Sequence, residues 1–80
     1  MSKLRVYLTY PPSLVKEPIV CEMYERHRVR FNVRTASVSD EIGIIGLELE
    51  GTQAELDAAM TFFRERGLSV EPIELDVLEP

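Results

Sequence analysis

Hydrophobic and polar residues alternate with a period of two along residues 4–9 and 29–35. Such alternation is typical of a β-strand with one buried and one exposed face. Residues 42–50, closed by Gly51, and residues 68–75 also fit strands. Pro72 lies inside the last stretch, and proline favours an edge strand because it has no N–H to donate. The sequence therefore predicts four strands, with the last at an edge of the sheet.

Two further stretches carry apolar residues at helical spacing. The first begins near Pro18, which a first helical turn tolerates because its missing N–H would have no partner there, and ends near His27. The second opens with Thr52 and Glu55, whose spacing predicts a capping box. Gly67 follows this helix at the place of a left-handed C-cap. The sequence therefore predicts a helix after the first strand and another after the third.

The order βαββαβ with short connections predicts an α+β, ferredoxin-like fold. Its four strands form an antiparallel sheet in the order 4-1-3-2, and right-handed crossovers place both helices on one face. We expect residues 1–80 to form one domain, with a core over about 3–75 and an acidic tail at 76–80.

One face of such a sheet meets the helices and the other stays open. The residues predicted to face the helices are Leu4, Val6, Leu8, Val29, Phe31, Val33, Ile45, Leu47 and Leu49. The residues predicted to face outward are Arg5, Tyr7, Thr9, Arg28, Arg30, Asn32, Arg34, Ile44, Gly46, Glu48 and Glu50. The open face is the natural place for a partner.

A hairpin register that pairs Ala36 with Ile42 places Asn32 opposite Gly46. The same register sets the cations of the second strand against the third, with Arg30 opposite Glu48, Arg28 opposite Glu50 and Arg34 opposite Ile44. An amide beside a position without a side chain could hold a carboxylate or an ammonium group. The alternative is that Gly46 is a bulge or twist point and Asn32 an ordinary surface residue.

Composition narrows the classes of function. The chain has 80 residues, 45% of them hydrophobic, and a formal net charge of −5. Residues 1–36 sum to +4 and residues 37–80 to −9, which favours pairing between the two halves. Cys21 and His27 are the one cysteine and the one histidine, too few for an internal disulfide or a Cys/His zinc site. We expect Cys21 to be a small, partly buried helix residue and His27 a helix-end residue.

The sequence argues against several other functions. An acyl-phosphate hydrolase on this fold would need an arginine in the loop after the first strand, and residues 10–17 offer only Lys16. RNA recognition would need stacking aromatics, and Tyr7 alone lies on the open face. No apolar run approaches the roughly 20 residues of a membrane span, and no signal core follows the start. We expect a cytoplasmic, non-enzymatic protein without metal, cofactor, nucleic acid or membrane insertion.

Five segments together resemble the NIL domain family over roughly residues 3–75. They are RVYLTYP (5–11), EPIV (17–20), FNVRTASV (31–38), GLELEG (46–51) and GLSVE (67–71). The family is a ferredoxin-like regulatory domain, best known at the C-terminus of the ATP-binding subunit of methionine importers, where it binds methionine. It also occurs fused to ferredoxins and free-standing. Its domains pair through their sheets, and the ligand lies near that pairing surface.

The resemblance implies a free-standing regulatory module that binds a small ligand, such as an amino acid or sulfur-related metabolite, and forms a homodimer. A ferredoxin- or transporter-related protein is the implied protein partner. The family's Asn-Ile-Leu run is Asn32-Val33-Arg34 here, and the cation at Arg34 departs from it. The predicted ligand-binding residues are Asn32, Arg34, Gly46, Tyr7 and Ile44. The alternative is a protein–protein adaptor without a small ligand.

Overall fold

Four strands and two α-helices make up the computed structural model, which describes residues 2–73. The elements in chain order are β1 (Ser2–Tyr10), a short 3-10 helix η1 (Pro12–Leu14), α1 (Ile19–His27), β2 (Arg30–Val38), β3 (Gly43–Gly51), α2 (Gln53–Glu65) and β4 (Ser69–Ile73). The predicted acidic tail at 76–80, and the end of the predicted fourth strand, lie outside the described residues.

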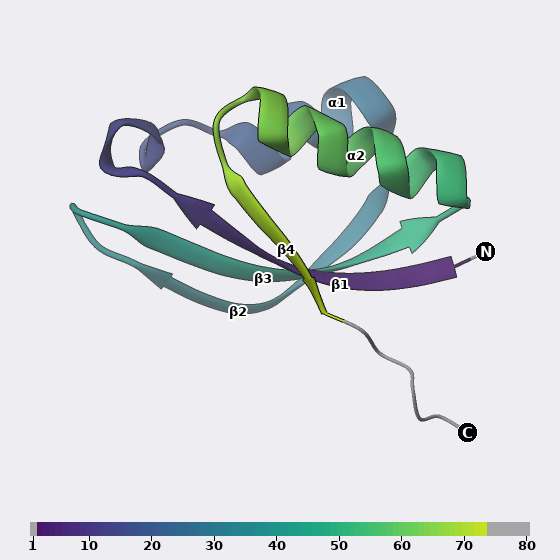
Figure 1. Ribbon diagram of the computed structural model, residues 1–80, viewed down its shortest axis with the longest axis horizontal. Helices are drawn as coiled ribbons and strands as arrows, with labels where there is room; N and C mark the ends of the chain where they lie inside the picture. Colours follow the sequence, from purple (N-terminus) through teal and green to yellow (C-terminus); the bar gives the residue numbers. More distant parts are fainter. Residues whose placement is uncertain (1, 74–80) are drawn as a thin grey trace.

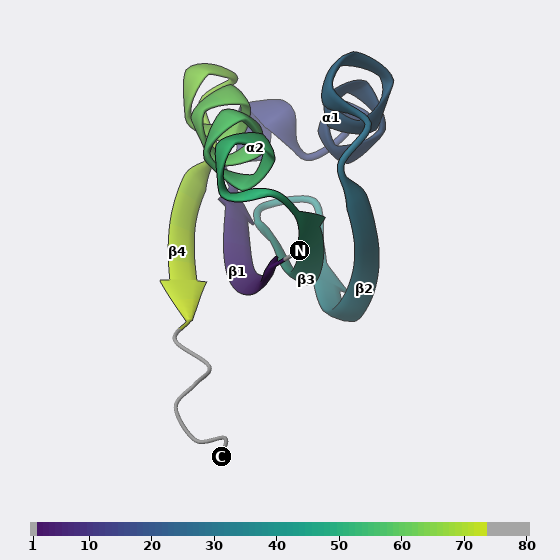
Figure 2. The same cartoon turned by 90° about the vertical axis from the view of Figure 1, so that its right-hand side faces the viewer.

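The sheet has the order β2-β3-β1-β4, and each neighbouring pair is antiparallel. This is the predicted order read from the other edge, so the ferredoxin-like prediction is confirmed. Both helices lie on the same side of the sheet, α2 toward β4 and α1 toward β2 (Figures 1 and 2). Neither α1 nor α2 lies on the opposite face, which the described part of the chain leaves open to that extent.

The core lies between the helices and the two central strands. Its contributors from β1 and β3 are Val6, Leu8, Leu47 and Leu49, each with 0% of its surface exposed. The helices add Ile19, Met23, Leu56, Ala59, Phe62 and Phe63. Burying side chains of this size contributes roughly 1.5–3 kcal/mol each, so the small core holds the sheet to its helices.

The capping box predicted for α2 is present. The Glu55 N–H donates to the Thr52 hydroxyl at 3.1 Å, and the Thr52 N–H donates to the Glu55 carboxylate at 2.8 Å. At the other end, Gly67 has a φ of +101°, as expected of a left-handed cap. Local sequence therefore sets both ends of this helix.

α1 begins after Pro18 and ends at His27, as predicted, but the residue after it corrects the prediction. Arg28 is the C-cap of the helix with a φ of 57°, and its N–H donates to the Tyr24 carbonyl at 2.8 Å. Its guanidinium lies over the Tyr24 ring, 5.3 Å from the centroid. Arg28 therefore caps a helix and does not face Glu50 across the sheet.

Three residues predicted to be at least partly buried are exposed. Phe31 and Val33 lie on the helix side of β2 with 38% and 51% of their surfaces exposed, and Cys21 is exposed on α1. β2 is an edge strand, and its Phe31 ring meets α1 at Tyr24, with 6.2 Å between the ring centroids. The alternation in β2 correctly predicts a strand, but its own helices leave the apolar face half uncovered.

Candidate functional site

The register between β2 and β3 differs from the predicted one, and a bulge explains the difference. Near the hairpin tip Val38 pairs with Gly43, whereas toward the other end Arg30 pairs with Glu50. The ladder shifts between Val33 and Thr35, so Arg34 is the extra residue of a β-bulge. At the hairpin tip the pairing is shifted by three residues from the predicted register, and an odd shift turns the other face of β2 outward. The extra residue Arg34 reverses this change for residues 30–33, so Asn32 still faces outward.

Asn32 therefore lies opposite Glu48, and Thr35 lies opposite Gly46. The predicted pairing of Asn32 with Gly46 is wrong. The cause is the connection itself, which is closed by Ser39. Its N–H donates to the Ile42 carbonyl at 2.9 Å, and its hydroxyl accepts from the N–H groups of Glu41 and Ile42 at 3.2 and 3.3 Å. This turn lets β2 continue to Val38, three residues beyond the predicted end of this strand at residue 35.

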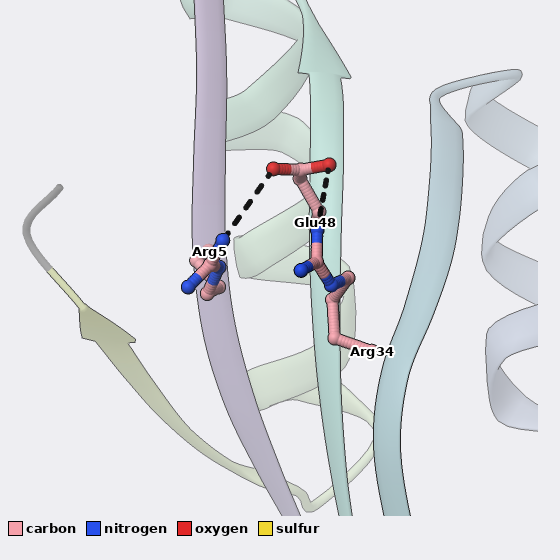
Figure 3. Close-up of polar contacts among 3 residues, drawn as sticks. All are labelled: Arg5, Arg34 and Glu48. Carbon is pink, nitrogen blue, oxygen red and sulfur yellow. Dashed lines mark ion pairs between the residues drawn. The ribbon is translucent and has the colours of Figure 1, made fainter.

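Glu48 lies between two arginines on the open face (Figure 3). Its Oε2 is 3.9 Å from Nη2 of Arg5, and its Oε1 is 3.7 Å from Nη1 of Arg34. Exposed pairs of this length contribute at most about 1 kcal/mol each. The Arg5 Nε is buried and has no hydrogen-bond partner among residues 2–73. One carboxylate facing two guanidinium groups leaves an excess of positive charge across β1, β3 and β2.

A shallow hollow of about 110 Å³ lies beside this cluster. Its lining residues are Lys3, Arg30, Phe31, Asn32, Glu48 and Glu50. The hollow thus offers cations, carboxylates and one amide within a volume smaller than the several hundred Å³ of a typical ligand cavity. Groups of both signs suit a small zwitterion, whose ammonium would meet a carboxylate and whose carboxylate would meet a cation.

The space above Gly46 is occupied, which corrects the expectation of room for a ligand there. A Cβ placed on Gly46 would lie 2.8 Å from Cγ2 of Thr35 and 2.9 Å from Cε1 of Tyr7. The absent side chain lets two neighbouring strands lay their side chains across the sheet at this point. Gly46 therefore has a packing role, which is neither the predicted opening for a ligand nor the bulge or twist point of the alternative.

The predicted site residues share the open face but fall into two groups. Asn32 and Arg34 lie around Glu48, at the bulge and the hollow. Tyr7 and Ile44, with 40% and 39% exposed, lie closer to the hairpin tip. Tyr7 pairs with Gly46 and covers it, and Ile44 lies two residues further along β3. Asn32 is the one predicted site residue among those that line the hollow. The other lining residues are Lys3, Arg30, Phe31, Glu48 and Glu50, and only the true register shows them beside Asn32.

Among residues 2–73, no three His, Cys, Asp or Glu side chains gather closely enough to hold a metal ion. Neither helix described there has the length and apolar character needed to cross a bilayer.

Known structures share this fold. The C-terminal domain of an ABC transporter ATP-binding protein from Enterococcus faecalis superposes with a TM-score of 0.77 at 18% identity, covering 91% of this chain and 86% of that chain. The de novo designed protein Ferredog-Diesel superposes with a TM-score of 0.50 at 10% identity, covering 91% and 85%. At these identities the likeness concerns the fold alone.

The family is assigned from a comparison of sequences. No curated protein matches it significantly. The sequence model of the NIL domain family, however, matches residues 4–72, which is most of the chain and includes the hairpin, the bulge and every lining residue of the hollow except Lys3. The chain therefore belongs to the NIL domain family.

Proposed function

We propose that this protein is a non-catalytic, cytoplasmic regulatory module of the NIL type that senses a small zwitterion, with an amino acid as the ligand class. The binding site is the hollow on the open sheet face. Asn32 would hydrogen-bond the ligand, a cation such as Arg30, Lys3 or Arg34 would hold its carboxylate, and Glu48 or Glu50 its ammonium group. Tyr7 and Ile44 would border the side chain of the ligand.

One observation carries this proposal: carboxylates, cations and an amide line the same hollow of about 110 Å³. That volume suits the head group of an amino acid and leaves its side chain on the surface of the sheet. The membership in the NIL family supports the regulatory role, because NIL domains of methionine importers bind methionine. The cation at Arg34 favours a ligand more polar than methionine.

A ligand that binds the folded protein stabilises it by RT ln(1 + [L]/Kd), about 2.7 kcal/mol at a hundredfold excess over Kd. For a domain of this size each kcal/mol raises Tm by roughly 4–8 °C. Thermal unfolding in a panel of amino acids, methionine included, is therefore a sensitive test. We expect a rise in Tm for a subset of the panel.

The matched variants are Asn32→Ala and Gln53→Ala. Asn32 lines the hollow, whereas Gln53 lies at the start of α2, where its Nε2 donates to Asp57 at 3.0 Å. The rise in Tm should be lost in the first variant and kept in the second. A panel with no rise in Tm contradicts the sensing proposal and leaves the adaptor reading, which the exposed apolar side chains of β2 favour.

A further inference from the structure

We propose that the ligand of the hollow is an acidic amino acid, whose side chain carries a second carboxylate. The inference rests on the proposed function, since it names the ligand within the class that the module senses. It depends on three features of the open face: a local surplus of cations, the long ion pairs at Glu48 and the spacing of two charged rows.

Cations outnumber carboxylates around the hollow. Two rows of side chains cross the open face there, and in each row a carboxylate of β3 lies between neighbours on β1 and β2. The rows are Lys3–Glu50–Arg30 and Arg5–Glu48–Asn32, and Arg34 adds a guanidinium to the second. Glu71 of β4 faces the same way beside Tyr7, but β1 and β3 separate it from the arginines of β2. The face is therefore locally positive, although the chain has a formal net charge of −5.

Arg5 and Arg34 retain N–H donors for a further anion. Their distances to the Glu48 carboxylate, 3.9 and 3.7 Å, exceed the roughly 2.8 Å of a charge-assisted hydrogen bond. The two arginine side chains are 37% and 47% exposed, whereas Glu48 is 21% exposed. The guanidinium groups are therefore accessible to a ligand and are only loosely paired.

The spacing of the two rows suits a molecule with two carboxylates. Side chains on one face of a strand repeat every second residue, so the rows lie about 7 Å apart. The α-carboxylate can meet the cations of the first row and the side-chain carboxylate the guanidinium groups of the second. The ammonium group then meets Glu48 or Glu50, so that every charge of the ligand has a partner.

A neutral amide in place of the side-chain carboxylate fits this arrangement less well. A guanidinium binds a carboxylate through two parallel N–H···O bonds. An amide of the same shape offers one oxygen and turns its NH₂ group toward the second donor. The second row therefore selects for the charged side chain.

The test is calorimetric titration of the protein with four free amino acids, aspartate and glutamate against asparagine and glutamine. Within each pair the ligands differ in charge but hardly in shape. We expect each acid to bind about tenfold more tightly than its amide, or more, because hydrogen bonds between charged groups are stronger than neutral ones. This preference should shrink at high salt, which screens exposed charges.

The matched variants are Arg34→Gln and Arg64→Gln, each of which removes one exposed arginine. Arg64 lies on α2, on the other side of the sheet (Figure 2). Arg34→Gln should reduce the preference for the acids at least about threefold, whereas Arg64→Gln should keep it. Far-UV circular dichroism checks that both variants fold, and the salt dependence is measured on the parent protein alone.

Three results would overturn the inference and leave the proposed function standing. They are equal affinity of the parent for acid and amide, an undiminished preference in Arg34→Gln, and binding of neutral amino acids alone. A parent that binds no amino acid of the full panel contradicts the proposed function as well.

Discussion

The Tyr7 ring lies against the backbone of Gly46, its partner across β1 and β3. The contact is so close that a Cβ on Gly46 would meet Cε1 of Tyr7 at 2.9 Å and Cγ2 of Thr35 at 2.8 Å. Side chains from the two neighbouring strands, Tyr7 from β1 and Thr35 from β2, thereby fill the space that a side chain at position 46 would take. The glycine that the sequence suggests as an opening is a packing point of the open face.

Gly46→Ala should therefore destabilise the protein by about 1–3 kcal/mol, the usual cost of overpacking. Gly43→Ala is the control, because a Cβ there would lie 3.5 Å from Cβ of Tyr10, an ordinary contact. Urea unfolding at neutral pH measures both variants. Equal stability of the two would contradict the packing role of Gly46.

Arg28 holds a left-handed conformation that costs a residue with a Cβ about 1–2 kcal/mol. Arg28→Gly and Arg28→Ala both remove the guanidinium over Tyr24, but only glycine relieves the backbone. We expect the glycine variant to be more stable than the alanine variant by about 1 kcal/mol in chemical denaturation. An alanine variant at least as stable as the glycine variant would show that the cap is not strained.

Thr52 supplies one half of the capping box of α2. Thr52→Ala should lower the free energy of unfolding by about 1 kcal/mol, since a helix N–H loses its acceptor. Thr61→Ala, exposed on the same helix, should change it by less than about 0.5 kcal/mol. Thermal or urea unfolding of the pair isolates the cap, and a loss at Thr61 as large as at Thr52 would argue against it.

Burial raises the pKa of Tyr10 above its ordinary value of 10.0, against the opposing effects of the Arg66 charge and a backbone hydrogen bond with Val20. The fold thus favours the neutral phenol. Its contribution to stability is complete below the unfolded pKa and is lost as pH rises through the folded one.

Tyr10→Phe should accordingly lose less stability than the parent between about pH 9 and pH 11. Unfolding in urea at a series of pH values compares the two proteins, and their difference cancels the other groups that titrate in this range. Parallel stability curves for parent and variant would mean that Tyr10 has the same pKa in both states.

Much of the fold could be predicted because its signals are local. The capping box at Thr52, the start of α1 after Pro18 and the strand alternation each depend on residues within one element. The register of the hairpin depends on the turn at Ser39 and on the bulge at Arg34, and neither has a reliable sequence signature. A three-residue shift at the tip and one extra residue moved Asn32 from Gly46 to Glu48.

The exposure of β2 could not be predicted for a different reason. Alternation shows that Phe31 and Val33 share an apolar face, but the pattern is the same whether that face meets a helix of the same chain or another molecule. The charged lining of the hollow could not be predicted either. The predicted register pairs Glu48 and Glu50 with arginines, and only the structure shows both carboxylates lining one hollow with Asn32.

The central claim is that the open sheet face at Asn32 binds an amino acid. Asn32 is the one asparagine of the chain and Gln53 the one glutamine, so a ¹H–¹⁵N spectrum contains two side-chain amide pairs. One pair reports on the hollow of the open face and the other on the start of α2. Titration of the labelled protein with the amino-acid panel should shift the Asn32 pair saturably and leave the Gln53 pair in place. An Asn32 pair that does not move with any amino acid would contradict the account.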